Sequence, residues 1–214
     1  MGTKTETAKI YDLLFKRFVS KRDDNYMLSH IAHERGFLYA SNGHILAKVK
    51  ADYPAEREGR AFSKTGSSEK STVPYERTIP PNREKDIYLS DEEVENLKIA
   101  AKNTWRTKID GKKVVINIGL PEIYYDYKMC YMTFRAEYLY SAFRLFDIRK
   151  EAPKIRISES KVMTLESETI TILIMPVMAC IKEDDPFFTA LTIQEAIEFK
   201  NQPKNIRDLA WYEQ

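Results

Sequence analysis

The chain has 214 residues, of which 43% are hydrophobic and 31% charged, and its net charge is +2. This composition is typical of a folded globular protein and excludes a disordered chain. A protein whose whole surface grips nucleic acid would be more basic, although the 34 lysines and arginines can still gather on one face.

Cysteine content and the absence of long apolar runs indicate the cellular setting. Cys130 and Cys180 are the only cysteines, too few for a disulfide framework, so we expect a reducing, cytoplasmic location. No signal peptide is recognisable at the N-terminus, and no run reaches the ~18 apolar residues that span a bilayer. We therefore expect no membrane partner.

An amphipathic helix is predicted over residues 7–20, followed by strands over 26–32 and 36–50. Apolar residues recur at helical spacing through the first segment, with Lys9 and Lys16 on the opposite side. The SNG sequence at 41–43 is a turn signal between two short strands, so the second segment reads as a hairpin.

Residues 54–86 are rich in charged residues, Ser, Gly and Pro and poor in aliphatic residues. We expect a flexible insertion or linker there, and an exposed connection is favoured over a functional lid.

The second half begins with a strong helix signal. The sequence SDEE, from Ser90 to Glu93, is a capping box and predicts a helix over 91–104. The remaining pattern predicts strands at 114–119 and 124–134, a helix at 136–147, strands near 154–158, 161–166 and 169–178, and a final helix near 192–200 capped by Thr192.

Residues 136–178 echo residues 8–50 at an offset of 128 without gaps. The matched pairs are Ala8 with Ala136, Phe15 with Phe143, Lys16 with Arg144 and Phe18 with Phe146. Both segments start as a helix and end in short strands, so the sequence predicts a duplicated helix-plus-strands unit.

The motifs of common enzymes and metal sites are missing or weak. His30 and His33 are three residues apart in a predicted strand, which directs their rings to opposite faces, so a metal site is disfavoured. No phosphate-binding loop, nucleophile elbow or dinucleotide fingerprint is present. We therefore expect no catalytic residue, no metal and no cofactor, although an enzyme with an unrecognised site stays open.

Four segments resemble, in order, parts of the DNA sliding clamp family of the bacterial DNA polymerase III beta-subunit type. SNGHILA (41–47) resembles the family's TDGHRLA strand, and VPYERTIPP (73–81) resembles its interdomain stretch. MTFRAEYLYSAF (132–143) and ILIMPVM (172–178) are similar to segments of its last domain. The chain departs from the pattern at Ile45, where the family has Arg, and near Met178, and it is too short for three clamp domains.

The resemblance implies an α+β, DNA-clamp-like fold, with helices packed on one face of antiparallel sheets and internal pseudo-symmetry. The expected parts are a first clamp-like half at 1–53, the linker at 54–86, a second clamp-like part at 87–180 and a helical C-terminal extension at 181–214.

By the same resemblance, we expect a non-enzymatic, processivity-factor-like protein. Its DNA-facing residues would be Lys9, Lys16 and Arg144, which would contact duplex DNA without reading its sequence. An apolar pocket would take peptides from polymerases or repair proteins, and the chain would form a homo-oligomer. The alternative is an adaptor or decoy that kept the fold without encircling DNA. The expected pocket residues are Gly43, His44, Leu46, Ile174, Met175, Pro176 and Val177.

Overall fold

The computed structural model describes residues 5–21, 26–71, 75–124, 128–180 and 187–199. The chain divides into two compact units that interleave along the sequence, unlike the four consecutive segments expected. Unit 1 comprises Met1–Tyr88 and Ser141–Met175, and unit 2 comprises Leu89–Tyr140 and Pro176–Gln214.

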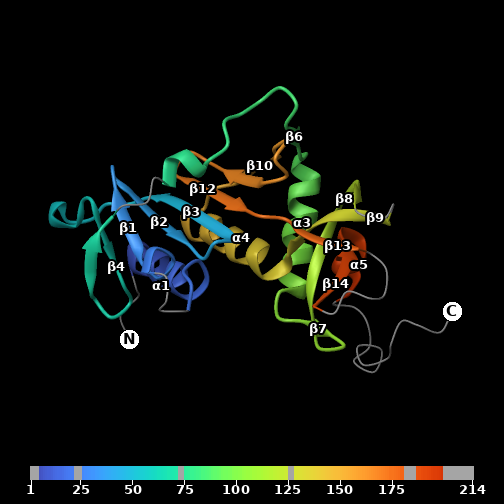
Figure 1. Ribbon diagram of the computed structural model, residues 1–214, viewed down its shortest axis with the longest axis horizontal. Coiled ribbons are helices and arrows are strands. Elements are labelled where there is room, and N and C mark those ends of the chain that lie inside the picture. The colour runs from blue at the N-terminus through green and yellow to red at the C-terminus, as the bar shows by residue number, and fades with distance from the viewer. Residues whose placement is uncertain (1–4, 22–25, 72–74, 125–127, 181–186, 200–214) are drawn as a thin grey trace. The chain divides into compact units, whose positions relative to one another are not determined.

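Unit 1 is built on a nine-stranded antiparallel sheet with the order β5-β4-β1-β2-β3-β12-β11-β10-β6. Figure 1 shows α1 and α4 on the same side of this sheet. The elements are α1 (Glu6–Arg17), α2 (Tyr26–Ser29), β1 (Ile31–Glu34), β2 (Phe37–Ser41), β3 (Ile45–Lys50), η1 (Ala55–Arg57), β4 (Arg60–Phe62), β5 (Ser68–Lys70), η2 (Tyr75–Thr78), β6 (Ile87–Tyr88), α4 (Ala136–Arg149, of which residues 141–149 belong to unit 1), β10 (Lys154–Ile157), β11 (Met163–Glu166) and β12 (Ile170–Ile174).

The centre of this sheet confirms the expected pseudo-symmetry. The order β1-β2-β3 on one side is mirrored by β12-β11-β10 on the other, and α1 and α4 precede the two groups. Strands β3 and β12 pair in antiparallel register from Ile45 with Ile174 to Val49 with Ile170. The two repeated units therefore meet through their last strands.

The ungapped offset of 128 is wrong for the strands. The first strands of the two units start at Ile31 and Lys154, 123 residues apart, and the last start at Ile45 and Ile170, 125 apart. The connection after α1 is longer because it contains α2, so the predicted strand at 26–32 is a short helix followed by β1.

Helix α1 follows directly from its sequence. The backbone N–H of Ala8 donates to the Thr5 hydroxyl at 3.4 Å, and acidic Glu6 lies in the first turn, where the helix dipole favours negative charge. Ile10 and Leu14 are fully buried, and each such side chain stabilises the fold by about 1.5–3 kcal/mol. This apolar stripe fixes which side of α1 faces solvent.

Different segments of the chain pack on the two faces of the sheet in unit 1. Side chains alternate along a strand, so Ile45 and Ile174 lie on one face with His33, which contacts Tyr11 of α1. We call this the inner face. The opposite, outer face carries Tyr39, Leu46 and Leu173, which cluster with Tyr75 and Ile79.

Residues 54–86, expected as a flexible linker, contain η1, β4, β5, η2 and β6 in their described part. Strand β4 pairs with β1, and Tyr75 is 3% exposed against the outer face. Few apolar residues are needed to anchor such a segment, which is why its polar composition alone predicted a linker.

An ion pair anchors the end of this segment. Arg156 on β10 donates from Nη1 to Asp86 at 2.9 Å and from Nη2 to the Pro80 carbonyl at 2.6 Å. The side chains of Arg156 and Asp86 are 2% and 0% exposed. The segment from Tyr75 to Asp86 is therefore held across the outer face of the sheet.

Unit 2 contains a mixed sheet with the order β13-β9-β8-β14, in which β14 runs parallel to β8 and β7 also pairs with β8. Its elements are α3 (Asp91–Thr104), β7 (Lys108–Ile109), β8 (Lys112–Tyr124), β9 (Lys128–Arg135), β13 (Val177–Cys180), β14 (Phe188–Thr192), α5 (Ile193–Glu198) and residues 136–140 of α4.

The capping box predicted at Ser90 and the helix cap predicted at Thr192 are both confirmed. The Glu93 N–H donates to the Ser90 hydroxyl at 3.3 Å, and the Glu93 carboxylate accepts from the Ser90 N–H at 2.7 Å. Thr192 and Glu195 form the same arrangement at α5. The C-terminal extension expected at 181–214 thus includes a strand before its helix, and residues 200–214 lie outside the described part.

None of the helices described in the structure combines the length and the apolar character that crossing a membrane requires.

Candidate functional site

The structure places two sequence-predicted segments side by side. The Met175 N–H donates to the His44 carbonyl at 2.9 Å, which extends the β3–β12 register by one pair. The turn before β3 is shaped by Asn42, whose Oδ1 accepts from the His44 N–H at 3.0 Å. Gly43 has φ +89°, a conformation that glycine adopts without strain.

The alternation of side chains sorts the expected pocket residues by face. His44, Leu46 and Met175 share the outer face, whereas Ile174 is fully buried on the inner face. Leu173, which sequence reasoning missed, lies directly opposite Leu46 on the outer face. Period-two alternation through β12 was the signal that could have found it.

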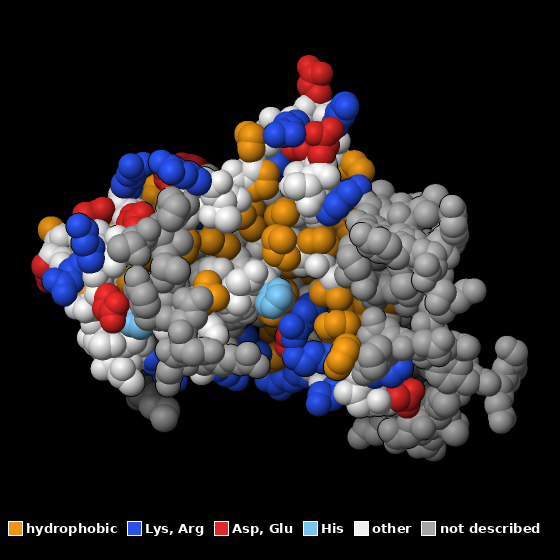
Figure 2. Space-filling model, in the orientation of Figure 1, with side chains coloured by type: hydrophobic (Ala, Val, Ile, Leu, Met, Phe, Trp, Pro, Cys, Tyr) orange, Lys and Arg blue, Asp and Glu red, His pale blue; other side chains and the backbone are white. Residues whose placement is uncertain are grey.

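We call His44, Leu46, Leu173 and Met175 the β3–β12 surface. Leu46 and Leu173 are 7% and 5% exposed, and Met175 is 45% exposed. Figure 2 shows hydrophobic side chains at the surface of unit 1 around this part of the sheet. The remaining two expected residues, Pro176 and Val177, belong to unit 2, where Val177 pairs with Thr133.

A polar and aromatic group lies beside this surface on the outer face. Tyr39 stacks on Tyr75 with ring centroids 5.1 Å apart, and the Lys48 ammonium lies 4.4 Å from the centre of the Phe37 ring. Glu76 accepts hydrogen bonds from both Lys48 and Tyr39 at 3.2 Å. The Lys48 hydrogen bond and charge lower the pKa of Glu76, so this carboxylate stays ionised.

The three cations expected to face DNA are exposed on the helices of unit 1. Lys16 forms an ion pair with Asp12 at 2.7 Å, and Arg144 lies 3.8 Å from Asp147. Each of these partners is on the same helix, one turn away. The positive charge of the two repeat-equivalent residues is therefore partly offset by neighbouring carboxylates.

Helices α1 and α4 are linked at their ends. Arg149 at the end of α4 donates to the Glu6 carboxylate at the start of α1 and to the Lys50 carbonyl at the end of β3. This contact fixes the two helices of the repeat against the sheet.

The surroundings of His33 indicate a structural role. It is fully buried, its Nε2 lies 2.6 Å from the Tyr11 hydroxyl, and its ring packs edge-on against Tyr53 and Phe62. Burial lowers the pKa of His33, and the charge of Arg57 adds to this effect. Within the described ranges, no three His, Cys, Asp or Glu residues are grouped to hold a metal ion.

No protein-family model matches this chain, and none of the curated proteins does. Among solved structures, it is similar to the beta sliding clamp of C. crescentus, with 15% identity and a TM-score of 0.49, over 84% of this chain and 68% of that one. It is also similar to DNA polymerase III subunit beta of Borrelia burgdorferi, with 16% identity and a TM-score of 0.49, over 79% of this chain and 61% of that one. The similarity to the sliding clamp of Bacillus subtilis has 15% identity and a TM-score of 0.46, over 80% of this chain and 63% of that one.

The chain thus spans about 61–68% of the length of these sliding clamps. Every one of these TM-scores lies below 0.5.

Proposed function

We propose that this chain is a non-enzymatic, clamp-like protein that docks a short partner peptide on the β3–β12 surface and associates with duplex DNA through the exposed faces of α1 and α4. The observation that carries the proposal is the hydrogen bond from Met175 to His44, which joins the two segments that resemble the walls of a clamp peptide pocket. His44 and Met175, which are 131 residues apart in the sequence, are neighbours there.

The chemistry of the β3–β12 surface suits an apolar peptide. Met175 is a large hydrophobic residue that is 45% exposed at its end of the strand pair. A thioether side chain adapts its shape to different ligands, and Leu46 and Leu173 supply a firm apolar floor beneath it. A peptide with aliphatic or aromatic side chains would bury this surface.

The peptide part is tested with a fluorescein-labelled, clamp-binding peptide from a bacterial polymerase. Replacing Met175→Glu places a charge where the peptide must desolvate, so binding measured by fluorescence anisotropy should weaken at least tenfold. Ile99→Glu is the matched control, because Ile99 is 36% exposed on α3 of unit 2. Equal weakening in both variants, or none in Met175→Glu, would refute docking at this surface.

The DNA part depends on Lys9, Lys16 and Arg144, which are exposed on the repeat-equivalent helices. Cations on such faces contact phosphates without reading bases, so the binding is sequence-independent and sensitive to salt. Reversing the charge at Lys16 and Arg144 together should weaken duplex binding in low salt. Reversal of exposed Lys64 and Lys70, at the β4–β5 hairpin, changes the charge equally and serves as the control.

A second candidate is an adaptor that keeps the fold and the peptide surface without holding DNA. The ion pairs of Lys16 with Asp12 and of Arg144 with Asp147 favour it, because they reduce the positive charge available to phosphates. A ring around DNA requires self-assembly, so light scattering separates the candidates. A strict monomer with peptide binding and without duplex binding supports the adaptor.

A further inference from the structure

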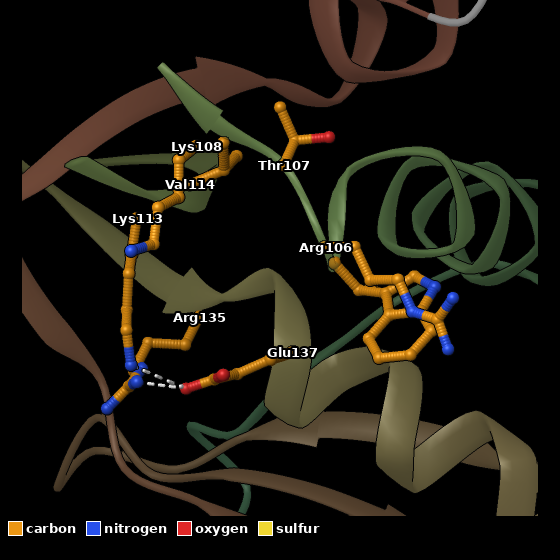
Figure 3. A pocket seen from close by; sticks show the side chains of 8 residues that line it. Arg106, Thr107, Lys108, Lys113, Val114, Arg135 and Glu137 are labelled. Carbon is orange, nitrogen blue, oxygen red and sulfur yellow. Dashed lines mark hydrogen bonds and ion pairs between the residues drawn. The ribbon is translucent and has the colours of Figure 1, made fainter. Parts of the chain in front are cut away.

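Unit 2 contains a recess of about 130 Å³ that the proposed function does not use. The end of α3, the β7–β8 hairpin and the junction of β9 with α4 surround it (Figure 3). Its lining residues are Trp105, Arg106, Thr107, Lys108, Lys113, Val114, Arg135 and Glu137.

The recess carries an excess of positive charge. Lys108 and Lys113 are paired in the β7–β8 register, so their side chains share one face of the hairpin. Figure 3 shows Lys113 and Arg135 converging on the carboxylate of Glu137, with Arg106 on the other side. Glu137 bonds Arg135 and lies 3.5 Å from the Lys113 ammonium. The lining thus contains one carboxylate and four cationic side chains.

The Arg135 side chain is fixed by its neighbours, and one of its N–H donors has no partner among the described residues. Its side chain is only 16% exposed, its Nη1 donates to the Tyr138 hydroxyl at 3.0 Å, and its guanidinium lies 4.5 Å from the centre of the Tyr138 ring. Its Nε is buried and has no hydrogen-bond partner among the described residues. A buried, unpartnered donor on a cation is costly, and an anion would satisfy it.

The opposite wall is rigid and aromatic. Trp105 stacks on Tyr140 with ring centroids 4.3 Å apart and an interplanar angle of 8°. The Arg106 guanidinium lies over the other side of Trp105, 4.2 Å from its centre. This stacking limits the rotamers of Arg106, which is one of the lining residues.

We propose that this recess binds a phosphate group. Its volume accommodates several water molecules, and therefore one phosphate. Arginine forks with lysine point charges are the usual protein donors to phosphate oxygens. Two sources share this chemistry, the backbone of a nucleic acid and free inorganic phosphate. The site uses no residue of the β3–β12 surface or of the DNA-facing set, so it stands independently of the proposed function.

Trp105 provides a direct reporter. The chain has two tryptophans, and in a Trp211→Phe background Trp105 is the only one. Inorganic phosphate, compared with chloride at equal ionic strength, should change the Trp105 emission saturably, and titration calorimetry should give the same dissociation constant. The double variant Lys108→Ser/Lys113→Ser should bind at least tenfold more weakly.

The matched control is Lys102→Ser/Lys112→Ser, which removes the same charge. Lys102 is exposed in the last turn of α3, and Lys112 lies on the opposite face of β8 from Lys113. This variant should bind within about twofold of the parent, whereas Arg135→Lys, which keeps charge but loses the fork, should bind about fivefold more weakly. Absence of saturable phosphate binding by both methods, or equal weakening in the control, would overturn the site.

Duplex DNA then separates the two sources. If Lys108→Ser/Lys113→Ser also weakens duplex binding more than the control does, the nucleic-acid backbone is the source. If only inorganic phosphate binding is lost, the site serves free phosphate. Because the phosphate titration contains no DNA and no peptide, its failure is distinguishable from a failure of the proposed function.

Discussion

The backbone N–H of Met175 donates to the carbonyl of His44 at 2.9 Å and closes the end of the β3–β12 pair. The β3–β12 pair joins the two repeated units of the sheet, and at this end of the pair an exposed methionine lies beside two buried leucines. Leu46 and Leu173 are therefore expected to stabilise the fold, whereas Met175 is exposed to a partner, and the two roles can be tested separately.

Leu173→Ala should mainly reduce stability, whereas Met175→Ala should mainly reduce peptide binding. Leu173 is 5% exposed and packs in the outer-face cluster, so its truncation should lower the free energy of unfolding by about 2–4 kcal/mol. Met175→Ala should change stability by about 0.5 kcal/mol or less but weaken peptide binding. Urea unfolding and anisotropy measure the two quantities. Comparable destabilisation by both would show that Met175 is part of the core.

Removing the acidic partners on the helices should strengthen DNA binding. Asp12→Asn with Asp147→Asn releases Lys16 and Arg144 from their ion pairs. Duplex affinity should rise, and the slope of log K against log salt should steepen by up to about 2, since each added phosphate contact contributes about 0.9. Binding titrations at several salt concentrations provide the measurement. An unchanged slope would favour the adaptor candidate.

His33 should make the protein less stable in acid. Burial lowers its folded pKa below the value of about 6.5 in the unfolded chain, so the unfolded state binds more protons as the pH falls. Stability is therefore complete above about pH 6.5 and is lost progressively as the pH falls toward the folded pKa. Unfolding in urea between pH 5 and 8 measures this effect.

The matching variant is His33→Gln, which removes the titrating group. It should be less stable at pH 8 but show a flatter dependence of unfolding free energy on pH. If the slope between pH 7 and 5 stays the same, then groups other than His33 cause the acid loss.

Breaking the ion pair of Arg156 and Asp86 should release the segment that covers the outer face. Arg156→Met leaves a buried, unpaired carboxylate and should destabilise unit 1 by about 3–5 kcal/mol. The double variant Arg156→Met/Asp86→Leu removes both charges and should recover most of this loss. Chemical denaturation of the two variants makes the comparison. A double variant as unstable as the single one would assign the effect to packing instead.

Much of the local structure could be predicted from the sequence because its causes are local. The helix caps at Ser90 and Thr192 and the apolar stripe of α1 depend on residues three or four positions apart, and all are confirmed. Within the helices the offset of 128 agrees with the burial pattern, because Ile10 and Leu14 of α1 are buried and so are Tyr138 and Ala142 of α4.

Other features depend on contacts distant in sequence. Residues 54–86 were predicted to be a linker because they contain few apolar residues. Those residues, such as Tyr75, become buried only when they pack on the outer face of the sheet. Ile174 was expected in the pocket, but the register with β3 turns it inward and Leu173 outward. The charged recess around Arg135 gave no signal because its lining comes from three separate segments.

The sequence by itself determined the helices, the short strands and the duplicated helix-plus-strands unit, because hydrophobic periodicity and turn chemistry are encoded within short windows. Its resemblance to sliding clamps implied the α+β class and singled out residues 41–47 and 172–178. Only the tertiary structure decided that β3 and β12 pair, which side chains share their outer face, and where charges collect in unit 2. Strand register and the choice of partner strand are set by burial across the whole sheet, and no short window of residues contains that information.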